Sequence, residues 1–82
     1  MKIYTINEPR FKHNGIMYDV DSHMYTSLLE FDNYLKEKNP SYVYIHSITN
    51  VDIDDNLVHP CNGLNNIRED IDIIFIRFKM IK

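Results

Sequence analysis

The chain has 82 residues and a formal net charge of -3, with 44% hydrophobic, 12% aromatic and 26% charged residues. This composition excludes the low-hydrophobicity signature of disorder, and the length predicts one domain that buries roughly 60–65% of the surface of its unfolded chain. The acidic balance and the scattered basic residues argue against a general affinity for nucleic-acid backbones.

The first local signal is a β-hairpin that follows a strand expected over residues 2–6. Asn14-Gly15 supplies the two positive φ angles of a type I′ turn between short strands. The two-residue loop sets the register, in which the opposed residues are His13 and Ile16, Lys12 and Met17, Phe11 and Tyr18, and Arg10 and Asp19. The side expected to face the core consists of Phe11, His13, Ile16, Tyr18 and Val20.

A helical period follows the hairpin, over residues 22–38. The apolar residues recur at i, i+4, i+7 and i+11 and form one stripe, which consists of Met24, Leu28, Phe31 and Leu35. Asp21 is a suitable N-cap for this helix, with Val20 and Tyr25 as a hydrophobic staple. A later start is the alternative, because Ser27-Leu28-Leu29-Glu30 fits a capping box. Asn39 and Pro40 end the helix.

Two further strands are expected over residues 42–49, with an extension to residue 53 as an alternative, and over residues 71–81. In the first of them, alternation separates Tyr42, Tyr44, His46 and Ile48 from Val43, Ile45, Ser47 and Thr49. Ile73-Ile74-Phe75-Ile76 is apolar on both sides, which predicts a central strand covered on both faces or a strand with one face reserved for a partner. The long connection at residues 54–70 is typical of a functional or disordered loop.

These elements predict a single α+β domain over residues 1–82. We expect a four- to five-stranded, mostly antiparallel sheet with one helix packed on it, in the order strand, hairpin, helix, strand, strand. A ferredoxin-like half is an alternative. Because Cys61 is the only cysteine and no run approaches the roughly 18 apolar residues of a membrane span, we expect a cytoplasmic protein that does not bind membranes.

A calcium site is considered at Asp52-Ile53-Asp54-Asp55-Asn56, where carboxylates alternate as they do at the start of a calcium loop. The rest of the loop does not fit, because Leu57 stands where the sharp turn needs glycine and Gly63 stands where a bidentate glutamate is required. We interpret this segment as a solvated acidic turn.

His59-Pro60-Cys61 offers two soft metal ligands, to which His13, His23 and His46 are candidate additions, but no recognised zinc spacing is present. A Cys61 nucleophile with His59 or His46 as its base is the enzyme hypothesis. Neither motif is complete. We therefore predict no catalytic residue, no metal site and no cofactor.

Two candidate binding surfaces follow from the pattern. The first is a ligand platform for a nucleotide or a single strand, which requires two strand faces to coincide and consists of Tyr42, Tyr44, Phe75, Arg77 and Lys79. The alternative interpretation makes the tyrosines core-edge residues and the cations a solvated strand end.

The second surface would bind a protein partner. Tyr25 and Leu29 form an i, i+4 pair more than 90° from the core stripe of the helix, so we expect them to be exposed. The loop adds Asn56, Leu57, His59, Asn62 and Leu64. Self-association is a further alternative, since it would supply core area that so short a chain lacks.

The opening strand, the single helix and the closing aliphatic strand resemble, in overall pattern, the small uncharacterised proteins carried by phages and prophages of Bacillus and its relatives. The resemblance covers most of the chain but not residues 54–70. It implies action on host processes by binding, in the host cytoplasm. Our first hypothesis is therefore a non-catalytic binding protein that inhibits a host or anti-phage defence protein. The alternative is an oligomeric small-molecule binder that sequesters a nucleotide signal.

Overall fold

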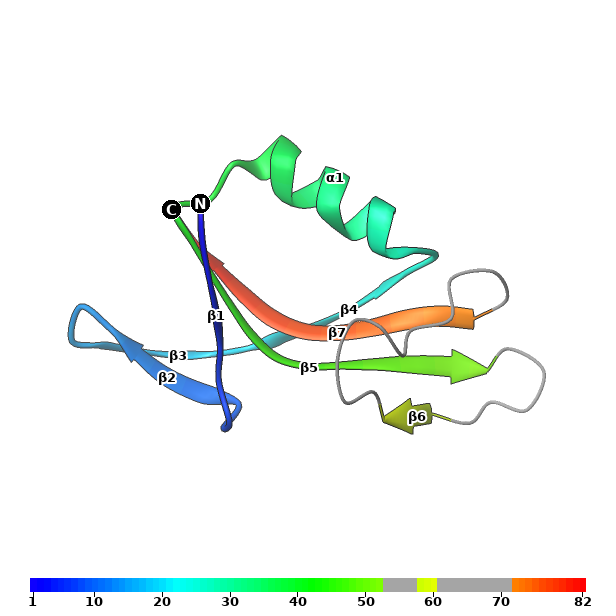
Figure 1. Ribbon diagram of the computed structural model, residues 1–82. Helices are drawn as coiled ribbons and strands as arrows, with labels where there is room; N and C mark the ends of the chain where they lie inside the picture. The colour runs from blue at the N-terminus through cyan, green and yellow to red at the C-terminus, as the bar shows by residue number, and fades with distance from the viewer. Residues whose placement is uncertain (53–57, 61–71) are drawn as a thin grey trace.

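A computed structural model describes the backbone of residues 1–52, 58–60 and 72–82, and the side chains of residues 1–50 and 73–82 (Figure 1). The elements are β1 (Lys2–Thr5), β2 (Arg10–His13), β3 (Ile16–Asp19), β4 (Asp21–Tyr25), α1 (Leu28–Lys38), β5 (Tyr42–Asp52), β6 (Val58–Pro60) and β7 (Asp72–Ile81). The predicted α+β class is confirmed. The strand β4, however, occupies residues that were expected to be helical.

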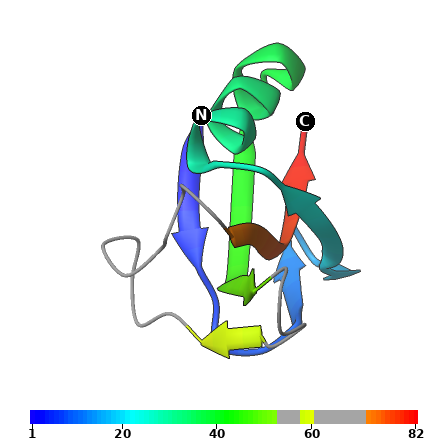
Figure 2. The same cartoon turned by 90° about the vertical axis from the view of Figure 1, so that its right-hand side faces the viewer.

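The main sheet has five strands in the order β1-β5-β7-β4, with β6 also paired to β5. The β1–β5 pair is parallel and the other pairs are antiparallel, so the mostly antiparallel sheet is confirmed. Figure 2 shows β1, β5 and β7 side by side with α1 above them. Because β4 and β5 run in the same direction on either side of β7, β4-α1-β5 is a split β-α-β unit, as found in ferredoxin-like folds.

The helix α1 begins at the later of the two expected positions. The Ser27 hydroxyl accepts a hydrogen bond from the Glu30 backbone N–H at 3.1 Å, and the Glu30 carboxylate accepts two from Thr26 at 2.6 Å each. The Thr26 hydroxyl and then its backbone N–H lower the pKa of Glu30. At the other end Asn39 adopts the left-handed conformation and donates to the Leu35 carbonyl at 2.8 Å, so the predicted end is confirmed.

The predicted start at Asp21 is wrong, because residues 21–25 pair with β7 as a strand. This pairing satisfies the backbone groups of β4 and turns alternate side chains to opposite faces of the sheet. Met24, which was expected in the core stripe, is consequently 64% exposed. Tyr25, which was expected on the surface, is only 8% exposed. Leu29 is exposed as predicted.

The hydrophobic core lies between α1 and one face of the sheet. It consists of Tyr25, Phe31, Leu35, Val43, Ile74, Ile76 and Phe78. Phe31 and Phe78 meet edge to face, with ring centroids 5.0 Å apart. The strand β7 therefore supplies the centre of the core, as its apolar sequence predicts. Within the described residues, no helix is long and apolar enough to span a membrane.

The β2–β3 hairpin has the predicted turn and register. Asn14 and Gly15 have φ angles of 50° and 80°, and the Arg10 guanidinium lies 2.9 Å from the Asp19 carboxylate. Phe11 is buried as expected, but Ile16 is exposed. The expectation of a core position for Ile16 is wrong because the tip of the hairpin extends past the main sheet (Figure 1).

Replacing Gly15 with alanine is expected to lower the free energy of unfolding by about 1–2 kcal/mol. A Cβ at Gly15 would have no neighbour within 4 Å, so the cost comes from the positive φ angle and not from a clash. Urea denaturation measures this loss in the free energy of unfolding. Gly15→Asn is the matched control, since asparagine tolerates this conformation, and equal losses in the two variants would contradict this explanation.

A β-bulge in β5 changes the predicted faces of that strand. The register with β7 shifts between Ile45 and Ser47, so His46 is the extra residue. An extra residue inverts the alternation beyond it. Ile48 therefore lies on the helix side with Ile45, while Ser47 and Thr49 lie on the side of Tyr44. The expected faces are correct up to Ile45 and wrong from Ser47 onward.

Candidate functional site

The face of the sheet that points away from α1 combines a cation, hydroxyls and an aromatic ring. We call it the outer face and define it by Ser22, Met24, Ser47, Thr49, Phe75 and Arg77. Cross-strand partners project to the same side, so Arg77 lies between Ser22 of β4 and Ser47 of β5. In the next row Phe75 lies between Met24 and Thr49. Two adjacent three-residue rows therefore cross the sheet.

The β5–β7 register also brings together the strand faces on which the ligand platform depended. Tyr44 pairs with Lys79, one row beyond Ser47 and Arg77. All five of the expected ligand residues thus project to one side of the sheet, and they are Tyr42, Tyr44, Phe75, Arg77 and Lys79. The sheet therefore has an aromatic end at β1 and β5 and a cationic part at β7.

The aromatic end is occupied by the protein's own hairpin. The Phe11 and Tyr44 rings stack with centroids 4.1 Å apart, and Tyr4 stacks on Tyr44 at 5.1 Å. His13 Nδ1 shares a hydrogen bond of 2.8 Å with the Tyr44 hydroxyl, and the His13 ring lies 4.4 Å from that of Tyr42. Burial, and then the neighbouring Tyr4 and Tyr42, raise the pKa of Tyr44. Tyr42 and Tyr44 therefore hold the hairpin against the sheet.

The two cations of β7 differ in their partners. Lys79 Nζ donates to the Asp21 carboxylate at 3.2 Å. Arg77 makes no ion pair with any residue whose side chain the structure describes. The residue is half-buried, its cross-strand partners are Ser22 and Ser47, and its guanidinium carries five N–H donors in a planar fork. Arg77 is therefore the residue of the outer face best suited to hold an anion.

Sequence reasoning did not find four residues of this face, namely Ser22, Met24, Ser47 and Thr49. Ser22 and Met24 were assigned to the helix, and the bulge reversed the expected orientation of Ser47 and Thr49. One weak signal existed, because serine competes for backbone hydrogen bonds and Ser22 is therefore unfavourable inside a helix.

The expected protein-binding surface is only partly described. Tyr25 belongs to the core, so the exposed pair with Leu29 does not exist. Of the loop residues, Asn56, Leu57, Asn62 and Leu64 lie outside the described residues, as do the segment 53–57 and Cys61. His59 is described only as backbone in β6.

The described histidines occupy three different surroundings. His13 contacts Tyr42 and Tyr44. The ring centroids of His23 and Phe78 are 5.0 Å apart, and His46 Nδ1 lies 3.3 Å from the Ile6 carbonyl oxygen. Among the described residues, no three of His, Cys, Asp or Glu are grouped as metal ligands. His13, His23 and His46, which were candidate additional metal ligands, are therefore not brought together.

Comparisons with protein-family models, with curated proteins and with solved structures give no match to this chain.

Proposed function

We propose that the protein is a non-catalytic binding protein whose outer face takes a small phosphorylated aromatic ligand of the nucleotide class. The observation that carries this proposal is the row Ser22-Arg77-Ser47 beside the ring of Phe75. Phe75 and Arg77 are two residues apart on one strand, which separates them by roughly 6–7 Å along the strand. A ligand that stacks on Phe75 can therefore place a phosphate at Arg77.

Each group of the outer face has a role in this proposal. A guanidinium forms paired, charge-assisted hydrogen bonds with a phosphate, and the hydroxyls of Ser22 and Ser47 are additional donors. A base stacked on an aromatic side chain gains about 1–3 kcal/mol. Met24 is exposed next to Phe75 and adds a polarisable contact. The acidic chain favours a small ligand over a nucleic-acid polymer.

The inhibitor hypothesis has less support from the described residues. Its helix surface has lost Tyr25 to the core and retains only Leu29. An apolar side chain that is singly exposed is ordinary on a protein surface. Inhibition of a host or defence protein, and the phage setting that suggested it, therefore remain a proposal from the resemblance alone.

Arg77→Gln is expected to weaken ligand binding at least tenfold, because it removes the charged fork and keeps a polar side chain. Calorimetry against AMP, ATP, GMP, GTP, adenosine and inorganic phosphate measures this, with the nucleotides binding more tightly than adenosine. Arg10→Gln is the matched control, since Arg10 is exposed on the hairpin and pairs with Asp19. The Arg10→Gln variant should bind the ligand with the affinity of the unaltered protein.

Two results would remove this proposal. One is the absence of heat and of any thermal stabilisation with every member of the panel. The other is equal affinity in Arg77→Gln and the unaltered protein. Circular dichroism of each variant shows whether the fold is retained, so a loss of binding can be separated from unfolding.

A further inference from the structure

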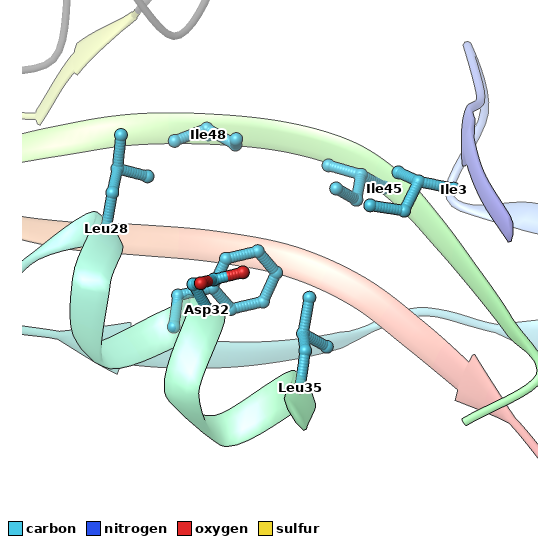
Figure 3. A pocket seen from close by; sticks show the side chains of 7 residues that line it. Ile3, Leu28, Asp32, Leu35, Ile45 and Ile48 are labelled. Carbon is cyan, nitrogen blue, oxygen red and sulfur yellow. The ribbon is translucent and has the colours of Figure 1, made fainter. Parts of the chain in front are cut away.

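An apolar groove lies on the opposite side of the sheet from the outer face, between α1 and the strands β1 and β5 (Figure 3). Its volume is about 250 Å³, and its lining consists of Ile3, Leu28, Phe31, Asp32, Leu35, Ile45 and Ile48. Ile3 at its edge is 56% exposed. This volume falls below the roughly 300–1,000 Å³ of typical small-molecule sites, so the groove is suited to a side chain of a partner.

Among the described residues that line the groove, Asp32 is the only charged one. Its carboxylate forms an ion pair with Lys36 Nζ at 2.9 Å, one turn further along α1, and the Lys36 side chain is 70% exposed and that of Asp32 49%. Such i, i+4 ion pairs at a surface contribute little to stability, so the Asp32 carboxylate can pair with another cation instead. The groove therefore suits an apolar side chain that has a cation beside it.

The hairpin carries this combination on the side that points away from the sheet. Met17 is 53% exposed and is the cross-strand partner of Lys12, which is also exposed. Lys12 makes no ion pair with the residues whose side chains are described. An unbranched methionine adapts to irregular apolar cavities, and Met17 lies here directly across from Lys12.

A chain cannot place its hairpin in its own groove. The hairpin packs through Phe11 on Tyr44, on the side of the sheet away from α1, whereas the groove lies on the helix side. Figure 1 shows the hairpin and α1 on opposite sides of the sheet. The hairpin that fits the groove must therefore come from another molecule.

We propose that two copies of this chain associate by exchanging hairpins, so that Met17 of each enters the groove of the other and Lys12 pairs with Asp32. An exposed methionine and an apolar groove would be covered together, and the charges next to them, on Lys12 and Asp32, are opposite. A two-fold arrangement makes both contacts at once and closes the assembly. It also gives a domain of this size, which has a small core, additional buried apolar area.

The test exchanges the two charges. Lys12→Glu and Asp32→Lys are each expected to shift the protein from dimer to monomer, by placing like charges at both contacts. The double variant carries the pair in reversed order and should recover the dimer. Sedimentation velocity over a range of protein concentrations, without any nucleotide, measures the mass. Glu37→Lys is the control, since Glu37 is exposed on α1 and does not line the groove.

A monomer at every concentration would overturn the proposal. Single reversals that leave the dimer intact, or a double variant that stays monomeric while each chain is folded, would overturn it as well. Met17→Ser is an independent check of the apolar part and should weaken association at least tenfold. Because no ligand is present, these outcomes do not depend on the proposed function.

Discussion

Replacing Phe78 with alanine is expected to lower the free energy of unfolding by about 3–5 kcal/mol, which is enough to unfold much of a marginally stable small domain. Phe78 is 2% exposed, and its ring contacts those of Phe31, Tyr25 and His23. The variant loses this buried area and leaves a cavity that the flanking strands cannot close. Urea denaturation followed by circular dichroism measures the change.

Leu29→Ala is the control for this prediction. Leu29 lies on α1 but is exposed, so its truncation should change the free energy of unfolding by less than about 0.5 kcal/mol. Similar losses in Phe78→Ala and Leu29→Ala would show that the core does not lie between α1 and β7.

Raising the pH from about 10 to about 12 is expected to destabilise the fold by up to about 2–3 kcal/mol. Burial raises the pKa of Tyr25 to about 12, with smaller contributions from Tyr34 and Glu30. In the unfolded chain the same phenol loses its proton near pH 10. Below pH 10 the stabilisation is complete. Above it the unfolded state releases a proton that the folded state keeps, so the free energy of unfolding falls.

Tyr25→Phe isolates this effect, because it keeps the ring and removes the titrating hydroxyl. The urea midpoint of this variant should fall less between about pH 9 and about pH 11 than that of the unaltered protein. The urea midpoint of Tyr25→Phe should still depend on pH to some extent, since the pKa of Tyr44 is also raised. An identical pH dependence in the two proteins would show that Tyr25 is not the group responsible.

The parts of the fold that the sequence predicts are those decided by near neighbours. Asn14-Gly15 determines its turn through its own φ angles, and Asn39 ends α1 in the same way. The strand β4 is different, because its state depends on pairing with β7. Met24 lies at helical spacing from Leu28 and Phe31 by coincidence, and tertiary pairing outweighs that local preference.

The candidate site was less predictable than the fold, for a related reason. Arg77 and Phe75 are recognisable in the sequence because they share one face of one strand. Ser22 and Ser47 join them only through the register of three strands and through a bulge at His46. A bulge depends on how two strands fit together, and the sequence of one strand does not record it.

The position of β7 also has a consequence for how the protein is made. This strand lies between β4 and β5, although both of them precede it along the chain. A nascent chain that has emerged only as far as β5 can pair β1 with β5, but β4 lacks its partner strand and the core lacks Ile74, Ile76 and Phe78. The ribosome must deliver residues 74–78 before the core can form, so folding is expected to be a single late event.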